Sequence, residues 1–91
     1  MNIICSKEAA EKLAKIQHYI NQNFGEAVSQ KYLKQVFKSI ERLASFPSIH
    51  PESQKRKGFR KLVVKKNTII LYKVAEEAIY IATVFDNLKG K

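Results

Sequence analysis

The hydrophobic pattern of this chain changes period once, near residue 58, and that change limits the folds open to it. Before it, apolar residues such as Leu13, Ile16 and Ile20 recur every three or four positions, which is the spacing of one helix face. After it, β-branched and aromatic residues dominate short segments separated by turn residues, which is typical of strands. A chain with helices in one half and consecutive strands in the other is expected to form an α+β fold.

Two helices are predicted in the first half. Ser6 supplies an N-cap hydroxyl for the first helix, Gly25 is among its stop signals, and Phe24 is expected to tuck under the bend. The second helix is predicted over about residues 26–44, because Pro47 keeps the residue before it out of the helical region. Its apolar stripe is expected to consist of Leu33, Val36, Phe37, Ile40, Leu43 and Ala44. The short connection predicts an antiparallel helical hairpin.

The predicted strands cover residues 3–5, 59–65, 68–74 and 78–85. We expect the first to be buried and to join an edge of the sheet or pair within it. Lys66-Asn67, where asparagine tolerates a positive φ, and Glu76-Glu77 are expected to turn the last three strands into an antiparallel meander. Residues 86–91 are expected to form a frayed tail. The sequence therefore predicts one domain over residues 1–91, a β-α-α-β-β-β two-layer sandwich with the helical hairpin packed on a mainly antiparallel sheet.

Several classes of protein are excluded by composition. The chain has 91 residues and no apolar run long enough for a membrane-spanning helix. Its first residues lack the basic start and long apolar stretch of a signal peptide, so we expect a cytoplasmic protein that does not act on membranes. One cysteine and two histidines that lie far apart, His18 and His50, predict neither a metal site nor a cofactor. Cys5 is expected to be buried in the first strand and therefore a poor nucleophile.

Positive charge is the first indication of function. The formal net charge is +9, which implies polyanionic partners, either nucleic acid or an acidic protein surface. Residues 55–66 carry seven basic side chains and no acidic one. The predicted target-binding or nucleic-acid-binding residues are accordingly Lys55, Arg56, Lys57, Arg60, Lys61, Lys65 and Lys66.

Two residues of the meander have competing interpretations. The basic segment can be a solvated edge strand that lysines protect against edge-to-edge pairing, but Arg60 stands between Phe59 and Leu62, where a strand would hold it rigidly. Its planar guanidinium suits bidentate contact with phosphate or carboxylate. Tyr72 is expected to be a core residue with its hydroxyl bonded at the rim. The alternative for Tyr72 is a role as acid, base or stacking platform.

The whole chain from about residue 6 to residue 85 resembles the RelE/ParE superfamily of toxins from bacterial type II toxin–antitoxin modules. The resemblance rests on SKEAAEKLAKIQHYINQNF and AVSQKYLKQVFKSIERLASFPSI in the first half, and on GFRKLVV, TIILYKV and AIYIATVF in the second. It implies the fold already predicted, a cytoplasmic toxin, and a cognate antitoxin as partner, with higher-order toxin–antitoxin complexes as a further expectation.

The resemblance implies two alternative targets. RelE-like members cut messenger RNA on the ribosome, whereas ParE-like members inhibit DNA gyrase. Arg60 matches the strand arginine of the nuclease branch, and Lys55, Arg56 and Lys57 match its basic loop residues. The turn position that often carries Tyr-Arg or His-Arg in the family holds Thr68-Ile69 here. After the last strand, where many members place His-x-Arg or a tyrosine, the chain reads Asp86-Asn87-Leu88.

We therefore expect ParE-like inhibition of gyrase by binding, without cofactors, with Arg60 as the principal binding residue. The alternative is a metal-independent, ribosome-dependent endoribonuclease (an mRNA interferase). In it, Arg60 would be catalytic by stabilising the phosphorane, with Tyr72 and Asp86 in support and Asp86 as a candidate base. A second alternative is an inactive toxin fold that only binds its antitoxin.

Overall fold

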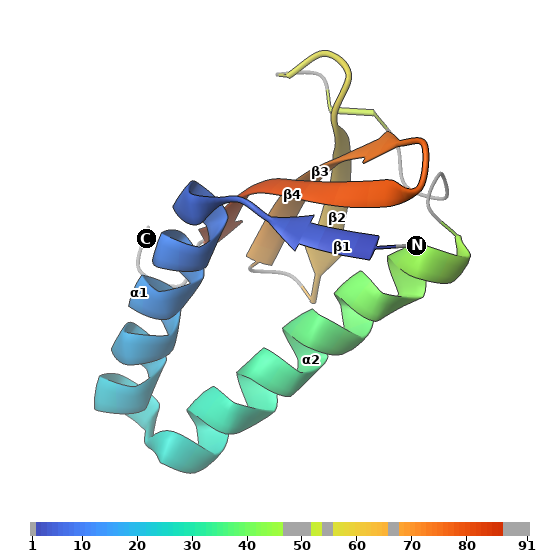
Figure 1. The fold of residues 1–91 in the computed structure, drawn as a ribbon. Coiled ribbons are helices and arrows are strands. Elements are labelled where there is room, and N and C mark those ends of the chain that lie inside the picture. Colours follow the sequence, from blue (N-terminus) through green and yellow to red (C-terminus); the bar gives the residue numbers. More distant parts are fainter. Residues whose placement is uncertain (1, 47–51, 54–55, 66–67, 87–91) are drawn as a thin grey trace.

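The computed structural model describes residues 2–46, 52–53, 56–65 and 68–86. Its elements, in order, are β1 (Asn2–Cys5), α1 (Lys7–Phe24), α2 (Glu26–Ser45), β2 (Arg60–Val64), β3 (Thr68–Ala75) and β4 (Ala78–Asp86). The four strands form one sheet in the order β1-β4-β3-β2, in which β1 runs parallel to β4 and the other neighbours are antiparallel. The predicted β-α-α-β-β-β sandwich is confirmed (Figure 1).

The two helices form a V whose bend points away from the sheet (Figure 1). Gly25, with φ of 95°, serves as the C-cap of α1 and the N-cap of α2, so one residue without a side chain reverses the chain. The helices bury one stripe each against the sheet, as the three- and four-residue spacing requires. The buried members of these stripes are Ala9, Ile16, Ile20, Val36, Ile40 and Leu43.

Strand register assigns each side chain of the meander to a face, because residues opposite each other in a sheet point to the same side. Leu62 pairs with Ile70, and Ile70 pairs with Val84, and all three belong to the core beneath the helices. A register shift follows Leu71, so that Leu71 faces Thr83 while Tyr72 faces Ile81. This bulge in β4 keeps both halves of the strand facing the core in spite of the extra residue.

Several local expectations from the sequence are wrong. All four residues of β1 are exposed, including Cys5, because β1 forms the sheet edge next to β4. Phe24 is 59% exposed at the bend instead of tucked under it, and Phe37 is 51% exposed beside the apolar stripe of α2. Asp86 is the last residue of β4 and not part of a frayed tail.

The loop before the meander is tied to it at the described positions. Glu52 forms an isolated antiparallel bridge with Arg60, and the Ser53 amide donates to the Phe59 carbonyl at 2.6 Å. In the β2–β3 turn a positive φ falls on Lys65, at 58°, while Lys66 and Asn67 lie outside the described residues, as does Pro47. Within the described segments, no helix has the length and hydrophobicity needed to cross a membrane.

Candidate functional site

The sheet face opposite the helices is the open face, and it combines cations, aromatic rings and aliphatic side chains. The strand register identifies the residues of this face, because they alternate with the core residues along each strand. The open face comprises Lys61 and Val63 from β2, Ile69, Leu71 and Lys73 from β3, and Tyr80, Thr83 and Phe85 from β4. Phe59, just before β2, continues the same alternation.

Most of the described cations predicted as binding residues are exposed. Arg56 and Lys57 lie in the turn that precedes β2, Lys61 lies on the open face, and Lys65 follows β2. The structure therefore places four of the predicted residues where a partner can reach them. The remaining lysines of the basic segment, Lys55 and Lys66, lie outside the described residues.

Arg60 and Tyr72 lie opposite each other in the register, on the side of the helices and not on the open face. Tyr72 is fully buried within the core cluster, which agrees with its interpretation as a core residue. Arg60 is half-buried at the start of β2. Arg60 and Tyr72, the candidates for catalysis in the nuclease alternative, thus lie on the sheet face opposite the exposed Lys61.

Asp86, at the end of β4, lies beside the hydrogen bond that joins Tyr32 of α2 to Thr68 of β3. It pairs in register with Thr68, whose Oγ1 lies 2.8 Å from the Tyr32 hydroxyl oxygen of α2. Burial raises the pKa of Tyr32, with the Thr68 hydrogen bond opposing this and the negative charge of Asp86 adding to it. The position of Asp86 on this side of the sheet separates it from the open face.

Two cation–aromatic clusters on the open face were not predicted from the sequence. The Lys12 ammonium lies 4.5 Å from the centroid of the Phe85 ring. On the other side of the face, the Arg56 guanidinium lies 5.0 Å and the Lys73 ammonium 5.9 Å from the centroid of the Phe59 ring. Such pairs hold a charged group over a ring face and fix where the charge is presented. Only the packing of α1 beside β4 brings Lys12 to this site.

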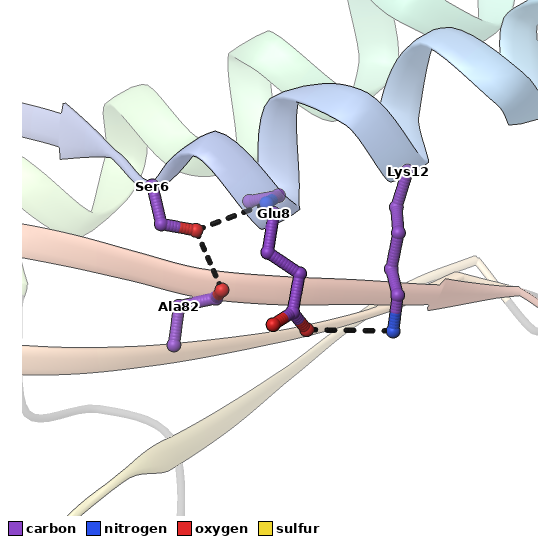
Figure 2. Close-up of polar contacts among 5 residues, drawn as sticks. Ser6, Glu8, Lys12 and Ala82 are labelled. Atoms are coloured by element: carbon purple, nitrogen blue, oxygen red, sulfur yellow. Dashed lines mark hydrogen bonds and ion pairs between the residues drawn. The ribbon is translucent and has the colours of Figure 1, made fainter.

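Glu8 is the carboxylate of this site, and it was not predicted from the sequence. Its Oε2 lies 3.5 Å from the Lys12 Nζ, and both side chains extend from α1 across β4 (Figure 2). Hydrogen bonding to Thr83 is the first cause of a lowered Glu8 pKa; desolvation opposes it, and Lys12 and then Arg56 lower it further. The carboxylate is therefore ionised at neutral pH.

Thr83 is the residue beneath this carboxylate. It is fully buried, and its Oγ1 has no hydrogen-bond partner of full geometry within the described structure. Its influence on the Glu8 pKa therefore comes from a contact that falls short of full hydrogen-bond geometry. A buried hydroxyl without a close partner is costly, and it leaves a donor available to an incoming group.

Ser6 fixes the start of α1 against the sheet. Its Oγ accepts a hydrogen bond from the Ala9 amide at 2.9 Å and donates one to the Ala82 carbonyl at 2.7 Å (Figure 2). Ala82 is the residue passed over by the register shift in β4. One hydroxyl thus caps the helix and binds the bulge, which sets where Glu8 and Lys12 emerge.

The described residues outside the open face add little chemistry. Cys5 is exposed, but partial desolvation raises the pKa of its thiol, so the nucleophilic thiolate is disfavoured. His18 is exposed on α1, and His50 lies outside the described residues. Across the described part of the chain, no three His, Cys, Asp or Glu residues are grouped as metal ligands would be.

Comparisons with known proteins agree with this fold. The model of the ParE toxin of type II toxin–antitoxin systems (parDE) matches residues 3–87. The chain resembles a structure of the chromosomal ParDE system from P. aeruginosa, with a TM-score of 0.82 and 16% identity over 94% of this chain and 95% of that one. No curated protein matches the sequence.

Two structures of YoeB from Staphylococcus aureus are also similar. In the heterotetrameric YoeB–YefM toxin–antitoxin complex the TM-score is 0.64 at 18% identity, over 93% of this chain and 94% of that one. For the YoeB dimer it is 0.54 at 27% identity, with the same coverage of 93% and 94%. The family model spans nearly the whole chain, and the fold is shared with these toxins. The chain therefore belongs to the ParE toxin family of type II toxin–antitoxin systems, within the RelE/ParE superfamily.

Proposed function

We propose that this toxin acts in the cytoplasm by binding DNA gyrase and inhibiting it, and that a cognate antitoxin neutralises it. The binding surface would be formed by the exposed cations of the meander and its preceding turn, which are Arg56, Lys57, Lys61 and Lys65. Arg60, which is half-buried on the helix side of β2, would contact gyrase separately from these cations. The match to the ParE family supports this branch of the superfamily.

The observation that carries the proposal is the register of Arg60 with Tyr72. Cleavage of RNA without a metal requires a base, an acid and a cation gathered around one phosphate. Here Tyr72 is fully buried in the core, and Arg60 lies on the same side of the sheet. The exposed cations of the open face lie on the other side. This separation supports action by binding over catalysis.

One observation favours the alternative, a ribosome-dependent endoribonuclease. The ionised Glu8 carboxylate lies beside Lys12 and within the influence of Arg56 on the open face. A carboxylate base next to cations could take the proton of a 2′-hydroxyl and stabilise the developing charge. Under this alternative the catalytic groups would belong to the open face, with Arg56 and Lys57 holding the RNA backbone.

Two assays on one purified sample test the proposal. One follows supercoiling by gyrase, and the other follows message integrity in a translating extract. We expect wild-type toxin to inhibit supercoiling and to leave message intact. Message cut on the ribosome would overturn the proposal in favour of the nuclease. An inactive toxin fold that only binds its antitoxin would show neither effect.

Charge-matched variants locate the binding surface. The double variant Arg56→Ala/Lys61→Ala should weaken inhibition of gyrase by about tenfold or more, since hydrogen bonds to charged groups contribute about 1.5–3 kcal/mol. The control Lys34→Ala/Lys38→Ala removes the same charge from the exposed face of α2 and should inhibit nearly as wild type does. Arg60→Ala should also weaken inhibition, and its unfolding curve must be compared because Arg60 is half-buried. Equal losses in both double variants would contradict a meander surface.

A further inference from the structure

Two neighbouring residues of the open face are buried although the helices cover the opposite side. Leu71 is 6% exposed and stands outside the core cluster, and its register partner Thr83 is 0% exposed. The groups around this pair are charged. Glu8 and Lys12 lie on the α1 side by Thr83 and Phe85, while Arg56 and Lys73 gather at Phe59 on the other side. A small apolar floor is thus surrounded by long, adjustable side chains.

The charges around this floor are unequal. Lys12, Arg56 and Lys73 are cations, and Glu8 is the carboxylate placed among them. Lys12 is held over the Phe85 ring and also paired with Glu8 at 3.5 Å. Lys12 therefore already has a carboxylate partner from its own helix.

We propose that the open face is a docking surface for an acidic protein segment bearing aliphatic side chains, and that Glu8 is an internal competitor for the partner's carboxylates. On binding, a partner carboxylate pairs with Lys12 and Arg56, and Glu8 turns out to solvent. This proposal rests on the proposed function and adds to it a description of how the neutralising partner binds. It depends on regulation by an acidic protein and not on gyrase being the target.

The apolar content of the face favours a protein segment over nucleic acid. Val63 is 47% exposed, Ile69 is half-buried, and Phe85 is 44% exposed, so aliphatic and aromatic surface lies between the cations. Aliphatic side chains of an amphipathic segment would bury this surface, whereas a phosphate backbone would leave Val63 and Ile69 without suitable partners. The net charge of +9 complements an acidic segment and disfavours a second copy of this chain.

Thr83 is the second observation that points to a ligand. Its buried hydroxyl lacks a hydrogen-bond partner of full geometry in the described structure, although it influences the Glu8 carboxylate. A partner carboxylate that meets the hydroxyl with better geometry than Glu8 does would accept this hydrogen bond. Forming it would remove the cost of an unsatisfied buried group, so part of the binding free energy would come from this residue.

Binding of a fluorescein-labelled synthetic peptide rich in Glu and Leu, followed by anisotropy, tests the proposal. Glu8→Gln should tighten binding by about fivefold, near the upper limit for an exposed ion pair. Glu41→Gln on α2 changes the net charge equally and should tighten binding less than about twofold. Equal effects of the two substitutions would show only a general charge effect and would overturn the role of Glu8.

Three further measurements complete the test. Lys12→Gln should weaken peptide binding more than Lys38→Gln does, because Lys12 lies over the Phe85 ring on the open face whereas Lys38 lies on the exposed face of α2. Thr83→Val should weaken binding by about threefold without lowering the unfolding midpoint, because it removes an unsatisfied hydroxyl. A thymidine oligonucleotide of equal charge should bind more weakly than the peptide, and stronger binding would overturn a protein partner. Because none of these assays contains gyrase, their failure is distinct from failure of the proposed target.

Discussion

At the scale of single residues, the Tyr32–Thr68 hydrogen bond is a polar contact that joins α2 to the sheet. The two oxygens lie 2.8 Å apart, and Thr68 is 1% exposed. Removing the phenol hydroxyl would leave a buried threonine hydroxyl without this partner, which costs about 1–3 kcal/mol. We expect Tyr32→Phe to lower the free energy of unfolding by about that amount at neutral pH, as urea titration would measure.

The same residue gives a pH dependence. Burial raises the pKa of Tyr32 in the folded state, and the negative charge of Asp86 adds to the rise. The tyrosine side chain of an unfolded chain has a pKa of about 10. The stabilisation is therefore fully present below that pH and is lost as pH rises from there through the raised folded-state pKa. The stability advantage of wild type over Tyr32→Phe should shrink above about pH 10, and an advantage that stays constant would contradict this assignment.

At the scale of elements, the attachment of α1 to β4 depends on Ser6. Its hydroxyl makes hydrogen bonds of 2.9 Å to the helix and 2.7 Å to the bulge of β4. Ser6→Ala should cost about 1–2 kcal/mol, which corresponds to a fall in Tm of roughly 4–16 °C for a domain of this size. Ser45→Ala, at the exposed end of α2, should change Tm little. Equal Tm values for the two variants would show that the cap contributes nothing.

The elements themselves were largely predictable, because helix and strand periods differ and caps and turn residues mark their ends. The core positions Ile16, Ile20 and Val36 followed from the same periodicity. The sequence did not indicate which strand each strand would pair with, or where in the sheet it would lie. Ile3–Cys5 looks like a buried strand because nothing local indicates that it will pair at the sheet edge.

The site was less predictable for the same reason. Arg56 and Lys61 stand out in a basic segment, and the structure exposes both. Arg60 also stands out, but the side to which it points is decided by its register with Tyr72. Lys12 and Glu8 belong to an ordinary amphipathic helix, and only the docking of α1 beside β4 brings them to Phe85 and Thr83.

At the scale of the whole molecule, positive charge is spread over both layers while the contacts suited to binding are on one. The net charge is +9, and exposed lysines occur on α2 as well as on the open face. Long-range attraction depends on total charge and is screened within about 10 Å at ordinary ionic strength. Short-range fit depends on the residues around Leu71 and Thr83. The two contributions should therefore separate in the kinetics of binding.

The association rate constant with the cognate antitoxin should fall by about tenfold or more as salt rises from about 0.05 to 0.5 M, because encounter is electrostatically steered. The double variant Lys34→Gln/Lys38→Gln, which removes charge from α2 alone, should slow association and leave dissociation almost unchanged. Lys12→Gln/Lys73→Gln removes the same charge from the open face, so it should slow association to a similar extent and also speed dissociation by about fivefold or more. Stopped-flow fluorescence measures both rate constants. If the two variants dissociate at the same rate, the antitoxin binds somewhere other than the open face. Loss of a direct contact raises the dissociation rate constant, whereas loss of steering charge lowers only the association rate constant.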